Sequence, residues 1–290
     1  MKNMTSYKIC YIVLNYRTYE ETTEFVKSTS KLLKGDDQII IVDNASEDGS
    51  GKKIADDYKE SSNVRVILSD RNLGFAGGNN LGFVEAKKLE YDFIIFSNSD
   101  ILICGSDFRS RLIDSYEKNK FDIEGPLIRD AKGNISLTSP QVPTYLSYER
   151  ALKGKRRNEM RYYLSFLGID KLVDRCFSLV SYPTDYNLSV KEDVQLAGCF
   201  LIFSKGYIER FDGIDDRTFL FLEEPLLYLR AKKNGLKIMF DPTLEVIHYE
   251  DASVGKVCNR KSGKMRRFQY IHQRKSFEIL CEELMEADNT

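Results

Sequence analysis

The chain lacks the features that mark several large classes of protein. Its 290 residues carry a net charge of only -1, which argues against a protein dedicated to nucleic acid. No apolar run approaches the roughly 18 residues of a membrane helix. The apolar segment near the N-terminus is cut short at residues 15–17, so it indicates a first strand rather than a signal peptide. We therefore expect an ordinary soluble globular protein.

The cysteines also lack the spacing of a zinc cluster or of a disulfide framework. They are scattered, and no two form a C-x-x-C pair. The six positions are Cys10, Cys104, Cys176, Cys199, Cys258 and Cys281. We expect free, mostly buried thiols in a reducing cytoplasm.

The N-terminal part of the chain alternates short apolar runs with longer amphipathic stretches. The runs typical of strands are 7–14, 38–43, 63–69 and 92–97, and the stretches with helical spacing are 18–33, 47–60 and 76–90. Strands that alternate with helices predict an α/β fold with a Rossmann-like, doubly wound and mostly parallel sheet. In such sheets ligands bind at the carboxyl ends of the strands.

The second half of the chain is less regular. We expect a strand and turn at 125–135, a basic amphipathic helix at 150–180, a strand and short helix at 196–211, a helix and strand at 221–249, and a final helix at 265–286. No linker or repeat interrupts the chain. We therefore expect one main domain over 1–250, with a variable, partly helical region at 140–195, and a basic helical tail over 251–290.

Polar residues follow each of the four expected parallel strands. They are Asn15 after the first, Asp43, Asn44 and Ser46 after the second, Arg71 and Asn72 after the third, and Asn98 and Asp100 after the fourth. Any one of them alone could be a helix cap or a turn residue. All four groups should lie at the same edge of the sheet, which favours a ligand site. Asp100 in particular interrupts an apolar stretch, and a buried carboxylate needs a partner, hydrogen bonds or a metal.

Seven blocks of the sequence stand in an order that resembles family-2 glycosyltransferases, most closely the bacterial rhamnosyltransferase-like branch of capsule and O-antigen polysaccharide synthesis. The blocks are IVLNY, IIIVDNASEDGS, DRNLGFAGGNN, FIIFSNSD, LAGCFLIF, RTFLFLEEPLLYLRAKKNGLKI and EVIHY. The second and third together are highly specific. The resemblance covers about residues 7–250. It implies a GT-A fold, a nucleotide-diphosphate-sugar donor, a divalent metal and transfer with inversion at the anomeric carbon.

The resemblance implies a metal site at Asn98-Ser99-Asp100, which matches the position of the family's D-x-D motif. Asp100 would coordinate Mg²⁺ or Mn²⁺, for which hard oxygen ligands are suited. His248 would be a further ligand. The alternatives are that Asp100 caps the next helix and that His248 is structural. Asn98 carries no charge, which would weaken metal binding.

The resemblance also implies a donor site along the first three strands. Its residues would be Leu14, Asn15, Asp43, Asn44, Arg71, Asn72, Gly77, Gly78, Asn98 and Ser99. The backbone at Leu14 and Asn15 would cradle the base, and Asp43 would accept a hydrogen bond from the pyrimidine N3–H. The glycines could let the backbone approach the ligand closely, or could simply form a tight loop.

The resemblance places the catalytic acid pair at Glu223-Glu224, with Glu224 as the base that takes the acceptor's proton. Pro225 suits the first turn of a helix. The helix dipole should then favour the ionised form of Glu224. The family's third acid is absent, because Leu226 stands there. The alternative is a surface capping box.

The implied reaction moves a sugar from a UDP- or dTDP-sugar, dTDP-rhamnose being one candidate, to a growing, lipid-linked cell-surface polysaccharide. Basic residues at 150–161 and 256–275 suggest a cytoplasmic enzyme held at the inner membrane face by anionic lipid, although a solvated charged face is the alternative. Two rival functions remain. A sugar nucleotidyltransferase should carry an early G-x-G-x-R loop, which is absent, and a non-catalytic nucleotide-sugar-binding module is favoured slightly by Asn98 and Leu226.

Overall fold

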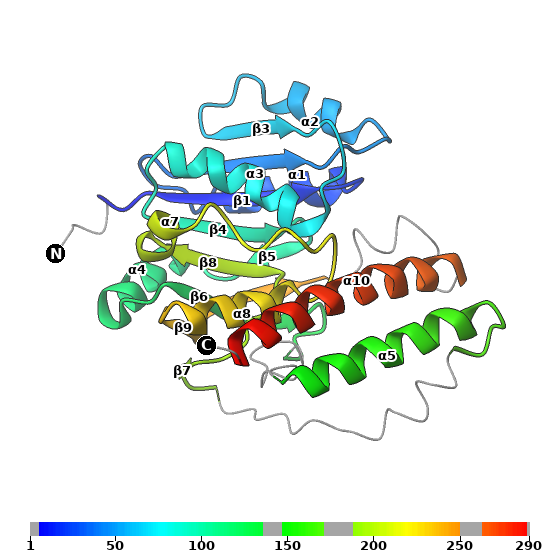
Figure 1. The fold of residues 1–290 in the computed structure, drawn as a ribbon. Coiled ribbons are helices and arrows are strands. Elements are labelled where there is room, and N and C mark those ends of the chain that lie inside the picture. Colours follow the sequence, from blue (N-terminus) through cyan, green and yellow to red (C-terminus); the bar gives the residue numbers. More distant parts are fainter. Residues whose placement is uncertain (1–5, 136–146, 171–187, 250–262, 289–290) are drawn as a thin grey trace.

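The computed structural model describes residues 6–135, 147–170, 188–249 and 263–288 (Figure 1). Its elements are β1 (Ile9–Asn15), α1 (Tyr19–Thr29), β2 (Gln38–Asp43), α2 (Ser50–Tyr58), β3 (Val64–Leu68), α3 (Gly74–Lys88), β4 (Phe93–Asn98), β5 (Ile101–Ile103), α4 (Phe108–Asn119), β6 (Ile123–Asp130), α5 (Tyr148–Ser165), β7 (Lys191–Glu192), β8 (Phe200–Ser204), α7 (Lys205–Arg210), α8 (Glu223–Lys233), β9 (Ile238–His248) and α10 (Gly263–Asp288).

A nine-stranded sheet forms the centre of the molecule. Its order is β3-β2-β1-β4-β8-β6-β9-β5, and β7 pairs with β9. The first four strands in this order are parallel, whereas β8 runs antiparallel to β4. Strand β6 is parallel to β9 and antiparallel to β8. The predicted α/β fold with a mostly parallel sheet is therefore confirmed, with β8 as an antiparallel strand in its middle.

Both faces of the sheet are buried. Alternate residues of β1 point to opposite faces: Ile9, Tyr11 and Val13 pack in one apolar cluster, and Cys10 and Ile12 pack in the other. The first cluster takes in side chains of α1, α2 and α4, and the second takes in side chains of α3, α7 and α8. This double coverage explains why the parallel strands read as continuous apolar runs rather than alternating ones.

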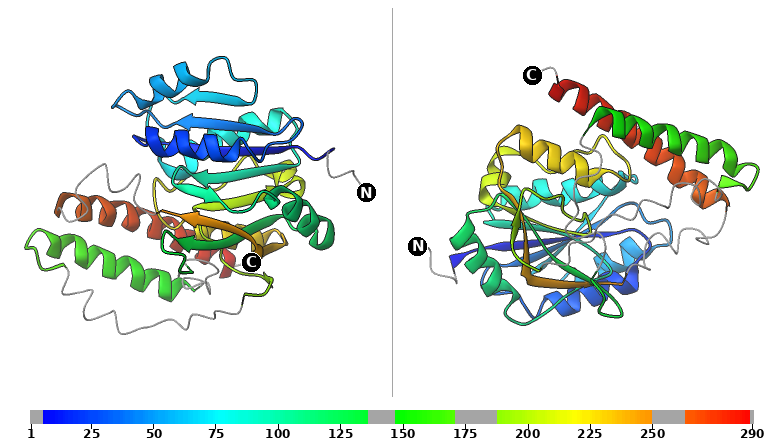
Figure 2. Two further views of the ribbon diagram at one scale, coloured as in Figure 1. Left: turned by 180° about the vertical axis from the view of Figure 1, so that it is seen from behind. Right: turned by 90° about the horizontal axis from the view of Figure 1, so that it is seen from below.

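Helices α5 and α10 pack side by side in antiparallel orientation beside the sheet, as the two views of Figure 2 show. They are far apart in the sequence, and this helix pair is called the α5–α10 hairpin below. Its base packs on α8 through an apolar cluster. The buried members of that cluster are Ala151, Leu226, Phe277, Leu280, Cys281 and Leu284. The expected helical tail is thus present and docked on the body of the protein.

Some details differ from the sequence-based expectations. The first helix ends at Thr29 rather than at residue 33, and the short strands β5 and β7 were not expected. The basic helix runs only from Tyr148 to Ser165, and the rest of its expected range falls largely at 171–187, outside the described residues. Cys176 and Cys258 also lie outside them, as does the basic stretch up to 262. The other four cysteines are free. None of the described helices is long and apolar enough to cross a membrane.

A buried ion pair fastens the amino-terminal edge of the sheet. Arg109 of α4 donates to Asp37, with 2.7 Å between Nε and Oδ2, and both side chains are almost wholly buried. The Asp37 carboxylate also accepts the backbone N–H groups of Ile9 and Lys34 at 2.9 Å each. The pair therefore joins α4, β1 and the turn before β2, at the sheet edge away from the polar strand ends.

Asp37→Asn should destabilise the protein by about 3–5 kcal/mol, because it leaves the Arg109 guanidinium buried and without its counter-charge. The neighbouring Asp36 provides a matched control, since it pairs with Lys8 at the surface. Asp36→Asn should change the free energy of unfolding by less than about 0.5 kcal/mol. Urea unfolding followed by circular dichroism measures both. Equal, small effects would show that the buried pair does not hold this edge.

Candidate active site

The polar groups expected at the strand ends do meet at one edge of the sheet. Asn15 at the end of β1 is opposite Asp43 at the end of β2, and Leu14 is opposite Asn98 at the end of β4. Asp43 is in turn opposite Leu68, the last residue of β3. Because the four strands are parallel, their carboxyl ends form a single continuous rim. We call it the carboxyl rim.

Asn15 is the centre of the carboxyl rim. Its side chain is fully buried, and its amide nitrogen donates to Asp43 at 2.6 Å and to the hydroxyls of Ser46 and Ser50 at 3.2 Å each. Its amide oxygen accepts from the backbone N–H and hydroxyl of Thr18 and from the hydroxyl of Thr22. The side chain is therefore committed inside the protein, and only the backbone of this residue could meet a ligand.

The carboxylate of Asp43 is held in a fixed position. Besides Asn15, it accepts the backbone N–H of Ser46 at 3.1 Å. Gly51, in the first turn of α2, packs so closely against this carboxylate that a Cβ there would collide with it. Both oxygens keep a free lone pair for a further donor, since a carboxylate accepts about four hydrogen bonds.

Asn44 and Asn72 close the turn that leads into α3. Asn44 donates to the Asn72 side chain at 3.0 Å and to the carbonyl of Gly74 at 2.9 Å, and accepts from the N–H of Leu73. Arg71, in contrast, is exposed on the same turn. A Cβ on Gly78 would collide with the Leu14 side chain. The close packing of α3 on β1 therefore accounts for this glycine without a ligand. Gly77 would meet only the Leu73 side chain.

Asp100 and His248 lie together, although 148 positions separate them in the sequence. His248 Nε2 is 3.2 Å from Asp100 Oδ1, and Ile101 pairs with His248 where β5 meets β9. Burial disfavours the charged imidazole, but the Asp100 carboxylate raises the pKa of His248 to about 10. The alternative in which Asp100 caps a helix is wrong, because β5 follows it and the next helix begins at Phe108.

These two side chains fit part of a divalent cation site. A buried carboxylate and a neutral imidazole are both common ligands for such ions, so His248 would release its proton when a cation binds. Among the described residues no group of three or more His, Cys, Asp or Glu could hold a metal. Asp100 and His248 could therefore supply two ligands at most, and a bound cation would need the rest from water or from a ligand's own oxygens.

The acid pair begins helix α8 and is buried rather than exposed. The Glu223 carboxylate accepts from the Thr218 hydroxyl at 3.3 Å, and that of Glu224 accepts the backbone N–H of Gly198 at 3.3 Å. The next carbonyl, that of Cys199, accepts the N–H of Asn98 at 2.9 Å. The pair is thus linked directly to the carboxyl rim. A surface capping box is wrong here, because Leu222 at the N-cap makes no side-chain hydrogen bond.

Burial, rather than the helix dipole, has the larger effect on the ionisation of Glu224. Burial raises the pKa of Glu224, and outweighs the stabilising N–H of Gly198. Burial also raises the pKa of Glu223, and the neighbouring Glu224 carboxylate raises it further. The physical reason is that two carboxylates side by side in a poorly solvated place disfavour each other's charge. Glu224 remains partly accessible, whereas Glu223 is buried.

The comparisons with known proteins agree with this arrangement. A family profile described as glycosyl transferase family 2 matches residues 10–176. The chain belongs to that family. It is 22% identical over 259 residues to N-acetylglucosaminyl-diphospho-decaprenol L-rhamnosyltransferase of Mycobacterium tuberculosis, covering 84% of this chain and 77% of the relative. It is also 21% identical to the low-salt glycan biosynthesis hexosyltransferase Agl10 of Haloferax volcanii, over 82% of this chain and 66% of that protein.

Solved structures of similar fold place the glycosyltransferase among GT-A proteins. A Pyrobaculum calidifontis mannosyltransferase in complex with GDP-Man and Mn²⁺ matches with a TM-score of 0.56 at 11% identity, over 96% of this chain and 70% of that one. Residues 1–349 of S. aureus TarS match with a TM-score of 0.52 at 15% identity, over 93% of this chain and 72% of that one. At such identities the likeness concerns the fold, which confirms the GT-A prediction.

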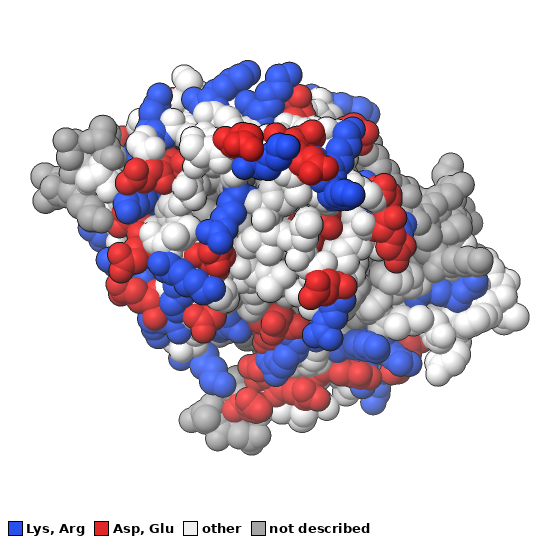
Figure 3. All heavy atoms as spheres, turned by 90° about the horizontal axis from the view of Figure 1, so that it is seen from above, with Lys and Arg blue, Asp and Glu red and all other residues white. Residues whose placement is uncertain are grey.

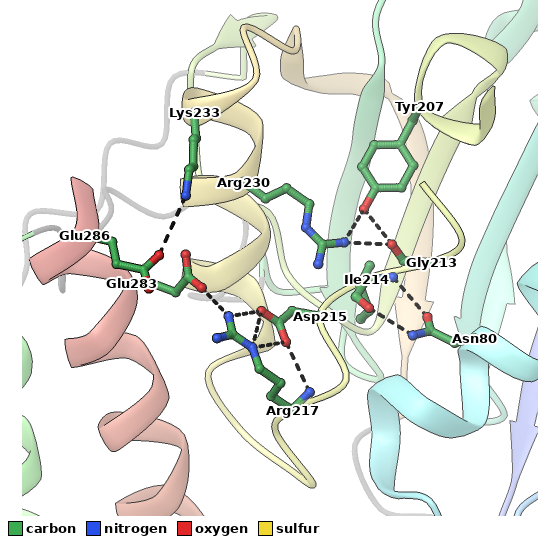
Figure 4. Close-up of polar contacts among 10 residues, drawn as sticks. All are labelled: Asn80, Tyr207, Gly213, Ile214, Asp215, Arg217, Arg230, Lys233, Glu283 and Glu286. Atoms are coloured by element: carbon green, nitrogen blue, oxygen red, sulfur yellow. Dashed lines mark hydrogen bonds and ion pairs between the residues drawn. The ribbon is translucent and has the colours of Figure 1, made fainter. Parts of the chain in front are cut away.

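The sequence did not indicate how the segment before the glycosyltransferase's acid pair is anchored. Residues 213–222 lead into α8, and Figure 4 shows part of their anchoring. Asn80 of α3 bonds both the N–H and the carbonyl of Ile214 at 2.9 Å, and Arg217 pairs with Asp215 and with Glu283 of α10. The segment is therefore clamped between α3, which follows the carboxyl rim, and the C-terminal helix.

The last residues of this segment are the most constrained. Phe219 accepts the N–H of Phe75 through its carbonyl and stacks on His272 of α10 at 4.6 Å, while the Ser276 hydroxyl donates to the Leu220 carbonyl. Phe221 and Leu222 then adopt left-handed backbone conformations, with φ of 76° and 67°. Such conformations cost about 1–3 kcal/mol each and persist where the surroundings impose them. No sequence pattern signals this strain, because neither residue is glycine or asparagine.

Glu223→Gln should stabilise the protein at neutral and alkaline pH. A carboxyl whose folded-state pKa is raised contributes fully to stability below its ordinary value of 4.5, and that contribution is lost as pH rises through the folded-state pKa. The neutral amide avoids this loss, so the free energy of unfolding of the variant should increasingly exceed that of the parent from pH 4.5 up to the folded-state pKa of Glu223. The full difference should be about 1.4 kcal/mol for each unit by which that pKa exceeds 4.5. Urea unfolding over a pH series measures it. Exposed Glu209→Gln is the control, and a gain independent of pH would contradict the burial argument.

Proposed function

We propose that this glycosyltransferase moves a sugar from a nucleotide-diphosphate-sugar, a UDP- or dTDP-sugar, to a hydroxyl of a glycan acceptor, with inversion at the anomeric carbon. One observation carries the proposal. The acid pair Glu223-Glu224 begins a helix that two hydrogen bonds, at Gly198 and Cys199, link to Asn98, at the rim where Asp43 and the Asp100–His248 pair also lie. A base, a candidate cation site and a candidate nucleotide site therefore share one edge of the sheet.

Glu224 is the proposed general base. Glu224 is partly exposed as a residue, whereas Glu223 is buried and its carboxylate accepts from Thr218. A raised pKa brings a carboxylate closer to the operating pH, which improves it as a proton acceptor. Glu223 then acts as a positioning residue. Its closeness raises the basicity of the pair, because neighbouring carboxylates disfavour a double negative charge.

The proposed step is a single displacement. The acceptor oxygen forms a bond to the anomeric carbon while the bond from that carbon to the diphosphate oxygen breaks, and Glu224 takes the hydroxyl proton. The electron pair of the broken bond leaves with the nucleoside diphosphate. When bound, Mg²⁺ or Mn²⁺ would neutralise charge on the leaving diphosphate, and Asp100 and His248 would hold it. Attack opposite the leaving group gives inversion.

The proposed donor lies along the carboxyl rim. Asp43 has acceptor capacity left for the N3–H of a uracil or thymine ring, and the backbone at Leu14 and Asn15 borders the same place. Asn44, Asn72 and the exposed Arg71 shape the turn beside it. Asn98 and Ser99 complete the set, and the remaining proposed donor residues are the glycines at the start of α3, Gly77 and Gly78.

The proposed acceptor is a lipid-linked glycan. The Mycobacterium tuberculosis relative is named for rhamnosyl transfer to a diphospho-decaprenol-linked sugar, which supports both this acceptor and a rhamnosyl donor. Within the proposed catalytic domain over 1–250, region 140–195 would face the acceptor. Attachment at the inner face of the membrane through the basic residues of 150–161 and of 256–275 would bring the enzyme to such a substrate.

A panel of UDP- and dTDP-sugars tests this function directly. Purified protein should bind at least one of them in a thermal-shift assay and turn it over with Mn²⁺ or Mg²⁺. Asp100→Asn keeps the side chain's shape but removes its charge, so metal-stimulated turnover should be lost while the circular dichroism spectrum is unchanged. Binding without turnover under any condition would favour a non-catalytic binding module. Full activity of Asp100→Asn would exclude this cation site.

Glu224→Gln should lower the single-turnover transfer rate by about two to four orders of magnitude, the usual span for a general base. Its affinity for the donor should barely change, because the lost interaction matters chiefly in the transition state. Glu223→Gln is the matched control and should lose less. A rapid-quench assay with saturating donor measures both variants. A larger loss for Glu223→Gln would move the base by one residue.

A further inference from the structure

The α5–α10 hairpin has its charges separated along its length. The first half of α10, residues 263–275, contains five basic residues and no acidic one, whereas residues 276–288 contain five acidic residues and no basic one. The exposed basic residues of α5, Arg150, Lys153 and Arg156, lie in its first half, toward the base of the hairpin. In Figure 3 the projecting end of the molecule, at the right, shows blue and white spheres, and red spheres gather nearer the body.

The same end carries a cluster of exposed apolar side chains. Tyr163, Phe166 and Leu167 are 65%, 60% and 72% exposed, and Met160 and Ile169 are also exposed. Five of the thirteen exposed large hydrophobic residues of the described chain thus fall within residues 160–169. Single exposed apolar residues need no explanation, but a contiguous group on a soluble domain marks an interaction site. We call this group the hairpin tip.

The hairpin tip combines aromatic and basic groups in direct contact. The guanidinium of Arg267 lies over the Phe166 ring at 5.0 Å, and the Tyr162 ring meets the rings of Tyr163 and Phe166 edge-on. The base of the hairpin is different, since its apolar side chains are buried against α8. The tip therefore presents an aromatic surface bordered by positive charge, on an element whose other end is firmly packed.

The position of the hairpin tip relates it to the candidate active site. Strands β1 to β4 end on the side toward which the hairpin projects, as Figure 1 shows, and Figure 2 shows the same projection from below. The carboxyl rim and the tip thus face the same way. A surface that met the tip would also lie on the side of the molecule where the proposed transfer takes place.

We propose that the hairpin tip docks on an anionic lipid bilayer, with Tyr163, Phe166 and Leu167 entering the interface and basic residues binding the headgroups. Aromatic rings beside lysine and arginine suit this interface, which is apolar on one side and negatively charged on the other. Each basic residue near an anionic surface adds favourable binding energy. Charge complementarity favours a bilayer over a second copy of this chain, whose matching tip would bring like charges together.

This inference deepens the proposed function, on which its biological meaning rests, by naming the surface that would present a lipid-linked acceptor. Docking through the tip turns the carboxyl rim toward the bilayer. Binding to vesicles, however, requires neither donor nor acceptor. A failure of the inference and a failure of the proposed transfer can therefore be told apart by measuring vesicle binding and turnover separately on the full chain.

The chain contains no tryptophan, so a single introduced tryptophan reports on its own surroundings. Phe166→Trp places the probe at the tip, and Leu89→Trp places it at an exposed position after α3, away from the carboxyl rim, as the control. With vesicles of phosphatidylcholine and phosphatidylglycerol, the indole emission of the Phe166→Trp variant should shift to the blue and be quenched by brominated lipid. The Leu89→Trp variant should show neither change. Equal responses from both variants, or no response from Phe166→Trp, would overturn the proposal.

Co-sedimentation with the same vesicles gives an independent measurement. The triple variant Tyr163→Ser, Phe166→Ser, Leu167→Ser should lose about tenfold or more in vesicle binding, because it removes most of the apolar contact. Arg267→Gln, which removes the positive charge that lies over Phe166, should lose about fivefold, at low salt only. Lys31→Gln with Lys52→Gln removes two exposed charges elsewhere and should change nothing.

Three outcomes would contradict the proposal. Wild-type binding by the triple variant would show that the tip does not touch the bilayer. Equal binding to vesicles of phosphatidylcholine alone would exclude the role of charge. A concentration-dependent blue shift of the Phe166→Trp variant without vesicles would identify a second copy of the chain as the occupant. Donor binding in a thermal-shift assay should be the same for the triple variant and the parent, since none of its residues belongs to the carboxyl rim.

Discussion

One buried amide side chain, Asn15, sets the geometry on which the candidate site depends. It is fully buried at the end of β1, and its six hydrogen bonds tie that strand to Asp43, to the segment before α2 and to the start of α1. A polar group so placed costs free energy unless it is satisfied, and here both its nitrogen and its oxygen are satisfied. The carboxylate of Asp43 is consequently fixed, and with it the outline of the carboxyl rim. The site is built by strand ends held in register rather than by flexible loops.

The carboxyl rim and the start of α8 bring together buried carboxyl groups whose charges are unfavourable there. Two carboxylates begin α8 where burial raises the pKa of each, and Asp100 is neutralised by His248. The strained residues 221 and 222 precede them, and α3 and α10 hold that segment from two sides. The C-terminal helix thus helps to fix the segment that leads into the acid pair. Sites of this kind trade stability for function.

Much of this could be predicted from the sequence, for identifiable reasons. The four parallel strands are continuous apolar runs between helical stretches, so periodicity was enough to predict these strands and the shared edge at which Asn15, Asp43 and Asn98 lie. The order of the strands in the sheet was not predicted. The contact between Asp100 and His248 depends on the pairing of β5 with β9. A strand of only three residues gives no recognisable pattern in the sequence. The raised pKa of Glu224 could not be foreseen either, because the helix dipole is readable from sequence while burial against residue 198 is not. Nor does any pattern reveal Phe221 and Leu222 as left-handed.

The central claim is that a nucleotide-diphosphate-sugar binds along the carboxyl rim, between the end of β1 and the start of α3. Hydrogen-exchange mass spectrometry of the full chain with UDP or dTDP and Mn²⁺ tests it most directly, because it locates the bound ligand without requiring the sugar or the acceptor. The account predicts slowed exchange in peptides that cover residues 14–18, 43–51, 71–80 and 97–100, with the amino-terminal edge around Asp37 unaffected. Slowed exchange confined to other parts of the chain, at nucleotide concentrations that saturate binding, would contradict it.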